Sequence, residues 1–67
     1  MAIYENIRVA CKEAGLSVSK LEEELGFARG SIYKWDTNVP SVTRVKQVSE
    51  RLNVSMEKLL DGYNPEG

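Results

Sequence analysis

The amino-acid sequence predicts an all-α protein: a compact bundle of five short helices in a single domain that covers residues 1–67. Three observations lead to this class. Apolar residues recur at the i, i+3, i+4 spacing that places them on one face of a helix. Glycine, asparagine and proline interrupt this pattern at short intervals, so each helix is short. The 67 residues suffice for one small core, and no apolar run approaches the ~20 residues of a membrane span.

The first helix is expected over residues 2–14. Its inward stripe, at positions i, i+4, i+7 and i+11, consists of Ile3, Ile7, Ala10 and Ala14. Gly15 follows this stripe and is expected to end the helix.

The second helix is expected over residues 17–25. Ser17 is a suitable N-cap because its hydroxyl can accept a hydrogen bond from a backbone N–H of the first turn. Leu16 and Leu21 stand at the spacing of a hydrophobic staple. Gly26 is expected to end the helix, because a chain leaving a helix often takes a left-handed conformation that glycine tolerates.

The third helix is expected over residues 28–36. At 100° per residue, Ile32 and Trp35 fall on one arc, which must face the core because these are the large apolar groups. The opposite arc carries Arg29, Gly30, Tyr33 and Lys34. Gly30 is unexpected there, because glycine inside a helix costs about 1 kcal/mol relative to alanine.

The fourth helix is expected over residues 41–52, after the break at Pro40. Its inward stripe consists of Val42, Val45, Val48 and Leu52. Asn53 is expected to end it. The fifth helix is expected over residues 55–61 with Ser55 as its N-cap, and the polar stretch "DGYNPEG" is expected to form a tail.

The residue content argues against an enzyme and against a metal protein. The chain has no histidine and one cysteine, Cys11, which gives neither a convincing zinc site nor a nucleophile paired with a base. No catalytic residue, metal, cofactor or small-molecule substrate is therefore expected. A lone cysteine forms no disulfide within the chain, which is typical of a reducing cytoplasm, and Cys11 is expected to be a small, semi-buried residue.

The charge is nearly balanced overall but uneven along the chain. The formal net charge is −1. Between positions 29 and 46 the acid Asp36 stands against the four cations Arg29, Lys34, Arg44 and Lys46. An exposed helix that carries cations suits the DNA major groove, where arginine or lysine can contact guanine O6 and N7. The acidic run Glu22–Glu24 is expected to be a solvated face.

Several short motifs occur together in the order that one family uses. They are "GLS" before the second helix, "LG" at its end, "SIYKW" in the third, a proline before the fourth and "LNVSMEKLL" at the fifth. A turn of about three residues joins the second helix to the third, which is helix-turn-helix spacing. In this combination the chain resembles the Cro/repressor (XRE-type) helix-turn-helix family, and within it the small repressors of Gram-positive bacteria and their phages and mobile elements.

This resemblance implies a lambda-repressor-like fold and a sequence-specific transcriptional regulator. The expected activity is repression, through a pseudo-palindromic operator in double-stranded DNA that a homodimer reads in the major groove. An antitoxin-like protein-interaction module of the same fold is the alternative that the sequence leaves open.

The resemblance also implies roles for individual positions. The base-facing positions of the family correspond to Ala28, Arg29, Gly30, Tyr33 and Lys34. The phosphate-contacting positions correspond to Ser17, Val18, Ser31 and Asn38, and Arg44 in the basic stretch is a further phosphate candidate. Gly30 is interpreted as clearance that lets the third helix lie deeper in the groove, with a merely tolerated glycine as the alternative.

Some positions depart from the family pattern. Glu22 stands where a small residue is usual, so its methylenes are expected to pack while its carboxylate reaches the edge. Ala28 replaces a hydroxyl N-cap, which leaves an amide donor free for phosphate or water. Val18 replaces a glutamine that contacts phosphate. Cys11 replaces an arginine that pairs with an acid at the position of Asp36, so this internal ion pair cannot form.

Overall fold

The computed structural model of the protein describes residues 3–61. This part of the chain forms four α-helices and one 3-10 segment without any strand, so the prediction of an all-α protein is confirmed. The elements are α1 (Ile3–Glu13), α2 (Val18–Leu25), η1 (Tyr33–Asp36), α3 (Val42–Leu52) and α4 (Met56–Leu59). Residues 1–2 and 62–67, which include the start of the expected first helix and most of the polar tail, lie outside the described residues.

Residues close in sequence determine where three of these helices begin and where two of them end. The N-caps, whose hydroxyl oxygens accept a backbone N–H three residues ahead over 3.0 to 3.3 Å, are Ser17, Ser41 and Ser55. These N–H groups have no partner within their own helix. Gly26, with φ of +75°, follows α2, and Asn53, with φ of +57°, follows α3. The left-handed conformation turns the chain out of each helix. Both residues were predicted to end their helices, and for Gly26 the left-handed conformation was predicted as well.

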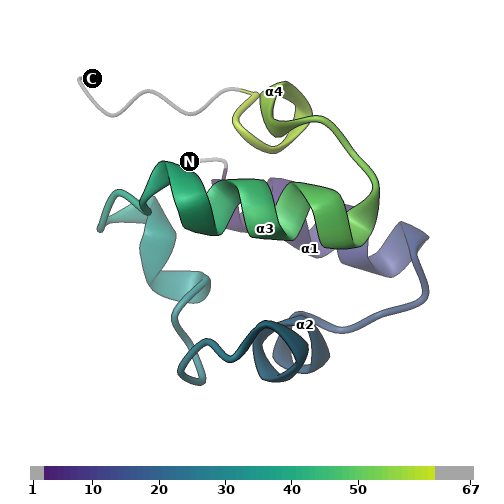
Figure 1. Ribbon diagram of the computed structural model, residues 1–67, viewed down its shortest axis with the longest axis horizontal. Coiled ribbons are helices and arrows are strands. Elements are labelled where there is room, and N and C mark those ends of the chain that lie inside the picture. The colour runs from purple at the N-terminus through teal and green to yellow at the C-terminus, as the bar shows by residue number, and fades with distance from the viewer. Residues whose placement is uncertain (1–2, 62–67) are drawn as a thin grey trace.

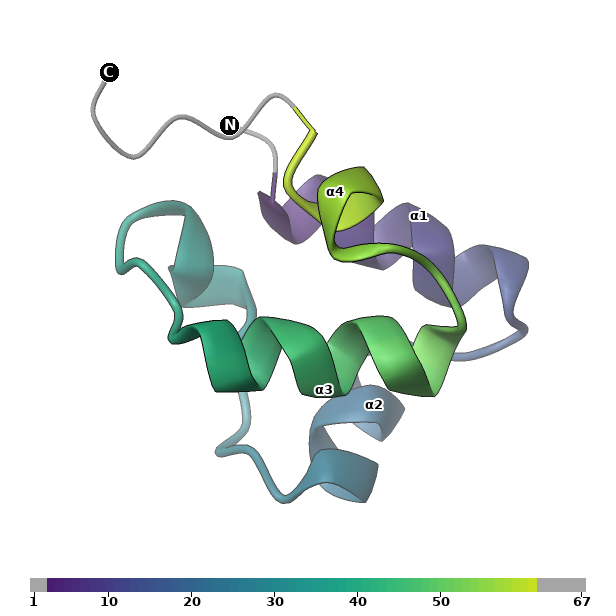
Figure 2. The same ribbon diagram turned by 45° about the horizontal axis from the view of Figure 1, so that its top comes forward.

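The helices α2 and α4 lie on opposite sides of the bundle formed with α1 and α3. Each of them contacts both α1 and α3, with α4 above and α2 below in Figure 1. The 3-10 segment η1 packs on α1. The chain between α2 and α3 forms one end of the molecule, as the turned view of Figure 2 also shows. Its contacts with α1 hold this end against the bundle.

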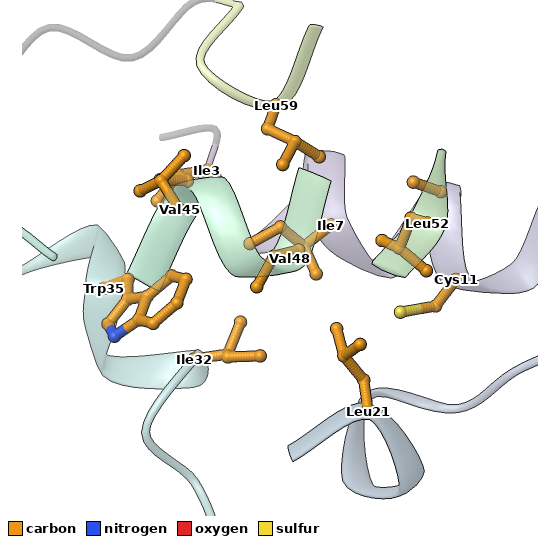
Figure 3. Close-up of a cluster of buried hydrophobic side chains, with 11 residues drawn as sticks. Ile3, Ile7, Cys11, Leu21, Ile32, Trp35, Val45, Val48, Leu52 and Leu59 are labelled. Carbon is orange, nitrogen blue, oxygen red and sulfur yellow. The ribbon is translucent and has the colours of Figure 1, made fainter. Parts of the chain in front are cut away.

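One cluster of buried apolar side chains forms the core, and every element contributes to it (Figure 3). The largest fully buried side chains are Ile3, Ile7, Leu21, Ile32, Leu59, Val48 and Cys11. Two predicted core positions are wrong. Ala14 follows the end of α1 and is exposed. Val42 is 72% exposed, because it occupies the first turn of α3, before the helix enters the bundle.

Long-range hydrogen bonds fasten both ends of the bundle to α1. The Asp36 carboxylate Oδ1 accepts the backbone N–H of Tyr4 over 3.0 Å, so the acid at the end of η1 serves the first turn of α1. The Asn6 amide Nδ2 donates to the carbonyl oxygens of Leu59 at 2.9 Å and Asp61 at 2.7 Å. These bonds satisfy backbone groups that a helix end leaves open.

The prediction of an α-helix over residues 28–36 is wrong. Residues 29–32 form turns, and only Tyr33–Asp36 is helical, as a 3-10 segment. The backbone bonds run from Lys34 N–H to Ser31 and from Trp35 N–H to Ile32, the i to i+3 pattern of a 3-10 helix.

The backbone conformation of Gly30 interrupts the helix. This residue has φ of +83°, a left-handed conformation that a right-handed helix cannot contain. The predicted fifth helix over residues 55–61 is also shorter, since α4 ends at Leu59.

Candidate nucleic-acid interface

The exposed surface of the segment between α2 and α3 carries most of the base-facing candidates. Ala28, Arg29, Tyr33 and Lys34 are all exposed there, and Gly30 is half-buried. These residues are held at the surface by two side chains of the same segment that point into the core. These are Ile32, which is fully buried, and Trp35, which is 4% exposed (Figure 3). The buried side chains of Ile32 and Trp35 thus fix the turn to the core, while the side chains of Arg29 and Lys34 are exposed.

A shallow hollow beside this segment brings together three of the phosphate candidates. It is lined by Ser31, Lys34, Trp35, Asn38, Val39, Pro40, Ser41 and Arg44. Ser31, Asn38 and Arg44 are the phosphate candidates, and Lys34 is a base-facing candidate at the same surface. The hollow combines hydroxyl, amide and cationic groups, which are the side-chain groups that contact DNA phosphates.

The other two phosphate candidates lie elsewhere, at the start of α2. Ser17 is exposed, and its hydroxyl already accepts the Lys20 N–H over 3.0 Å. Val18 packs against the core and has no polar side-chain group. Neither residue lines the hollow that contains Ser31. The structure therefore divides the predicted phosphate contacts between two places.

Arg44 is held over an aromatic side chain. Its guanidinium carbon lies 5.4 Å from the centre of the Phe27 ring, which is the geometry of a cation–π contact. The Phe27 ring in turn lies 5.8 Å from the ring of Trp35, at a tilt of 56°. Through these contacts the cation at the start of α3 has a defined position next to the turn.

Tyr33 packs on a neighbouring side chain and is exposed at the same time. Its ring meets the ring of Tyr4 edge to face, with centroids 5.2 Å apart, so it covers part of α1. It is nevertheless 68% exposed, and most of its surface remains available to a ligand.

Glu22 packs inward, but its carboxylate is buried and does not reach the edge as expected. This residue is 4% exposed, so the prediction that it belongs to a solvated acidic face is wrong. Its Oε1 accepts the N–H of Gly30 and its Oε2 accepts the N–H of Ile32, each over 3.0 Å. A signal was present, because Glu22 stands four residues after Val18 and three before Leu25, on the apolar stripe of α2. The amide donors of Gly30 and Ile32 are accordingly occupied rather than free.

The structure gives Gly30 a different explanation from clearance inside a helix. No helix runs through this residue, and its left-handed φ of +83° is the reason for a glycine. A Cβ atom added at this position would meet nothing of the protein within 4 Å, so contacts inside the protein do not require a glycine there. Within the protein, it is the backbone conformation that disfavours a larger residue there.

We expect Gly30→Ala to lower the free energy of unfolding by about 1–2 kcal/mol, the cost of a left-handed conformation for an L-residue. Gly30→Asn is the matched control, because asparagine enters this conformation more readily and Asn53 already does so in this chain. Its loss should be smaller. Thermal unfolding followed by circular dichroism measures both variants. A higher melting temperature for Gly30→Ala, as for a glycine inside a helix, would contradict the left-handed turn.

Cys11 is a buried, unreactive side chain, and the described residues contain no candidate metal site or membrane span. Burial raises the pKa of the Cys11 thiol, which keeps it protonated and packed in the core. Among residues 3–61 there is no group of three or more histidine, cysteine or acidic side chains arranged to hold a metal ion. No helix in this same range is long and apolar enough to span a membrane.

Comparison with known proteins gives two matches. A protein-family model described as a helix-turn-helix domain matches residues 4–65 of the chain. A Methanocaldococcus jannaschii protein named "Putative HTH-type transcriptional regulatory protein" is 40% identical to it over 53 residues. The match covers 76% of this chain and 17% of that protein, so the chain spans a small part of this relative. No solved structure was found to match the chain.

Proposed function

The chain belongs to the helix-turn-helix domain family, and from this premise we propose that it is a sequence-specific DNA-binding repressor of transcription, of the Cro/repressor (XRE) type. The observation that carries this proposal is the surface between α2 and α3. There Arg29, Tyr33 and Lys34 are exposed on a turn that Ile32 and Trp35 anchor in the core. The name of the archaeal relative, a transcriptional regulatory protein, supports the same activity.

In this proposal the turn and η1 enter the major groove. Arg29 and Lys34 contact base edges, with guanine O6 and N7 as their preferred acceptors. Ala28 and Gly30 present little or no side chain, and Tyr33 offers an aromatic face to a thymine methyl or a sugar. The groups of the adjacent hollow, Ser31, Asn38 and Arg44, hold the phosphate backbone, and the start of α2 contacts a second backbone segment.

In this proposal a chain of net charge −1 binds DNA because the cations of the turn face outward while nearby acids bond to other groups of the protein. Two acids near the turn are already engaged by the protein. Glu22 accepts two backbone N–H groups, and Asp36 accepts the Tyr4 N–H. Glu23 and Glu24 on α2 pair with Lys20 and Arg51.

We propose that two copies bind one pseudo-palindromic operator. One turn of this size reads only a few base pairs, so two half-sites are needed for useful specificity. Their centres should lie about 34 Å apart, one turn of the double helix. A dimer on such an operator represses by occupying a promoter.

The decisive experiment is selection of bound sequences from random duplex DNA. The expected result is enrichment of one pseudo-palindrome, bound by two chains per duplex. The matched control is the double variant Arg29→Ala, Lys34→Ala, which should enrich nothing comparable. A wild-type chain that enriches no sequence contradicts the proposed function. Full affinity of a single chain for one half-site contradicts the dimer alone.

We expect Arg44→Ala to weaken binding to every DNA sequence by a similar factor, because a phosphate contact carries no sequence information. The plot of log affinity against log salt concentration should become shallower by about 1. Titrations of the selected duplex and of a scrambled duplex at several salt concentrations measure both quantities. A loss confined to the selected duplex would show that Arg44 reads bases instead.

A further inference from the structure

Glu22 makes two hydrogen bonds that cross from α2 to the turn that follows it. Its two carboxylate oxygens each accept a different backbone N–H, Oε1 from Gly30 and Oε2 from Ile32, both over 3.0 Å. The side chain is 4% exposed, so water does not compete for these bonds. Bonds from N–H donors to an ionised carboxylate are stronger than those to a neutral acceptor.

The turn itself provides no side chain for this purpose. The usual solution at the start of a helical segment is a hydroxyl or carboxylate at the N-cap, which accepts an N–H two or three residues ahead. Here Ile32 is the N-cap of η1 and makes no side-chain cap bond, and Ala28, which precedes the turn, has a side chain that cannot accept a hydrogen bond. Glu22 supplies the missing acceptor from the preceding helix.

The two bonded amides lie at the centre of the surface proposed to read DNA. Gly30 separates Arg29 from the residues of η1, and its left-handed φ of +83° sets the direction in which the chain continues toward Lys34. Ile32 is the buried anchor of the same turn. The carboxylate therefore fixes both the bend and the anchor that lie between the two cations.

We propose that Glu22 is a positioning residue for DNA recognition, which holds Arg29 and Lys34 at the spacing that matches one base sequence. This inference rests on the proposed function. It assigns specificity to an acidic residue that touches no DNA and whose own charge opposes binding to phosphates.

Glu22→Gln tests this role because glutamine has almost the same shape but only one acceptor oxygen. One of the two amides then faces an NH2 group and loses its bond. Glu23→Gln is the matched control, since it removes the same charge from an exposed neighbour on the same helix. Both variants change the net charge of the chain by the same amount, so a loss confined to Glu22→Gln is not an effect of net charge.

Two measurements are made on each folded variant. Hydrogen exchange by NMR reports the protection of the Gly30 and Ile32 amides, which should fall in Glu22→Gln and not in Glu23→Gln. Affinities for the selected and a scrambled duplex give the specificity ratio. This ratio should fall about tenfold in Glu22→Gln, the effect of one charge-assisted bond, and stay unchanged in Glu23→Gln. A merely stabilising role would lower both affinities alike and leave the ratio unchanged.

A second-site variant provides a rescue. A serine at position 28 can accept the Gly30 N–H, two residues ahead, as in a serine turn. Ala28→Ser combined with Glu22→Gln should recover part of the protection and of the specificity ratio, each compared with Ala28→Ser alone.

The outcomes separate this inference from the proposed function. If the wild type selects a sequence and Glu22→Gln keeps the wild-type ratio and amide protection, the positioning role is wrong. If the wild type selects no sequence, the proposed function fails. The amide measurement still decides the structural part in that case. Lower protection of the Gly30 and Ile32 amides in Glu22→Gln supports Glu22 as the residue that fixes the turn, and unchanged protection contradicts it.

Discussion

Trp35→Ala is expected to lower the free energy of unfolding by about 3–5 kcal/mol, the typical loss for a large aromatic side chain removed from a core. Trp35 is 4% exposed and packs with Phe27 at a centroid distance of 5.8 Å. It joins η1 to the rest of the core (Figure 3). In a domain of this size such a loss approaches the whole stability, which is about 5–15 kcal/mol for ordinary domains.

Urea unfolding followed by circular dichroism measures this loss, because the variant removes the single tryptophan of the chain. Trp35→Phe is the matched control, since it keeps an aromatic ring against Phe27 and leaves a smaller cavity. It should lose clearly less than Trp35→Ala. An unfolding midpoint of Trp35→Ala equal to that of the wild type would mean that η1 is not part of the cooperative core.

Arg29→Ala and Lys34→Ala are each expected to weaken binding to the selected duplex by about 1–3 kcal/mol and to relax the preference at particular base pairs. Both side chains are exposed, so the fold should change by no more than about 0.5 kcal/mol. The measurement is affinity for a series of duplexes that differ by one base pair each.

Lys12→Ala provides the control for these two variants. Lys12 is an exposed cation in the last turn of α1, outside the candidate interface, and its removal should leave the base preferences unchanged. Equal losses of Arg29→Ala on every duplex in the series would mean that this side chain neutralises phosphate without reading bases. The same criterion applies to Lys34→Ala.

The sequence by itself determined the all-α class, four of the helices and most of the core. These features depend on interactions between residues close in the chain. The Ser55 hydroxyl reaches an N–H three residues ahead, and Asn53 turns the chain immediately after α3. Helical spacing likewise placed Ile32 and Trp35 inward, and both are buried. The exposed position of Arg29 and Lys34 follows from the same periodicity.

Only the tertiary structure decided the conformation of the segment that presents these cations. A periodic pattern of apolar residues over 28–36 is compatible both with an α-helix and with turns followed by a 3-10 segment. The choice depends on partners far away in the chain. The Glu22 carboxylate holds the amides of Gly30 and Ile32, eight and ten residues ahead, and Asp36 bonds the Tyr4 N–H, thirty-two residues back. A buried carboxylate is stable only where hydrogen-bond donors surround it. These donors come from residues that only the folded chain brings together, so the sequence alone does not reveal them.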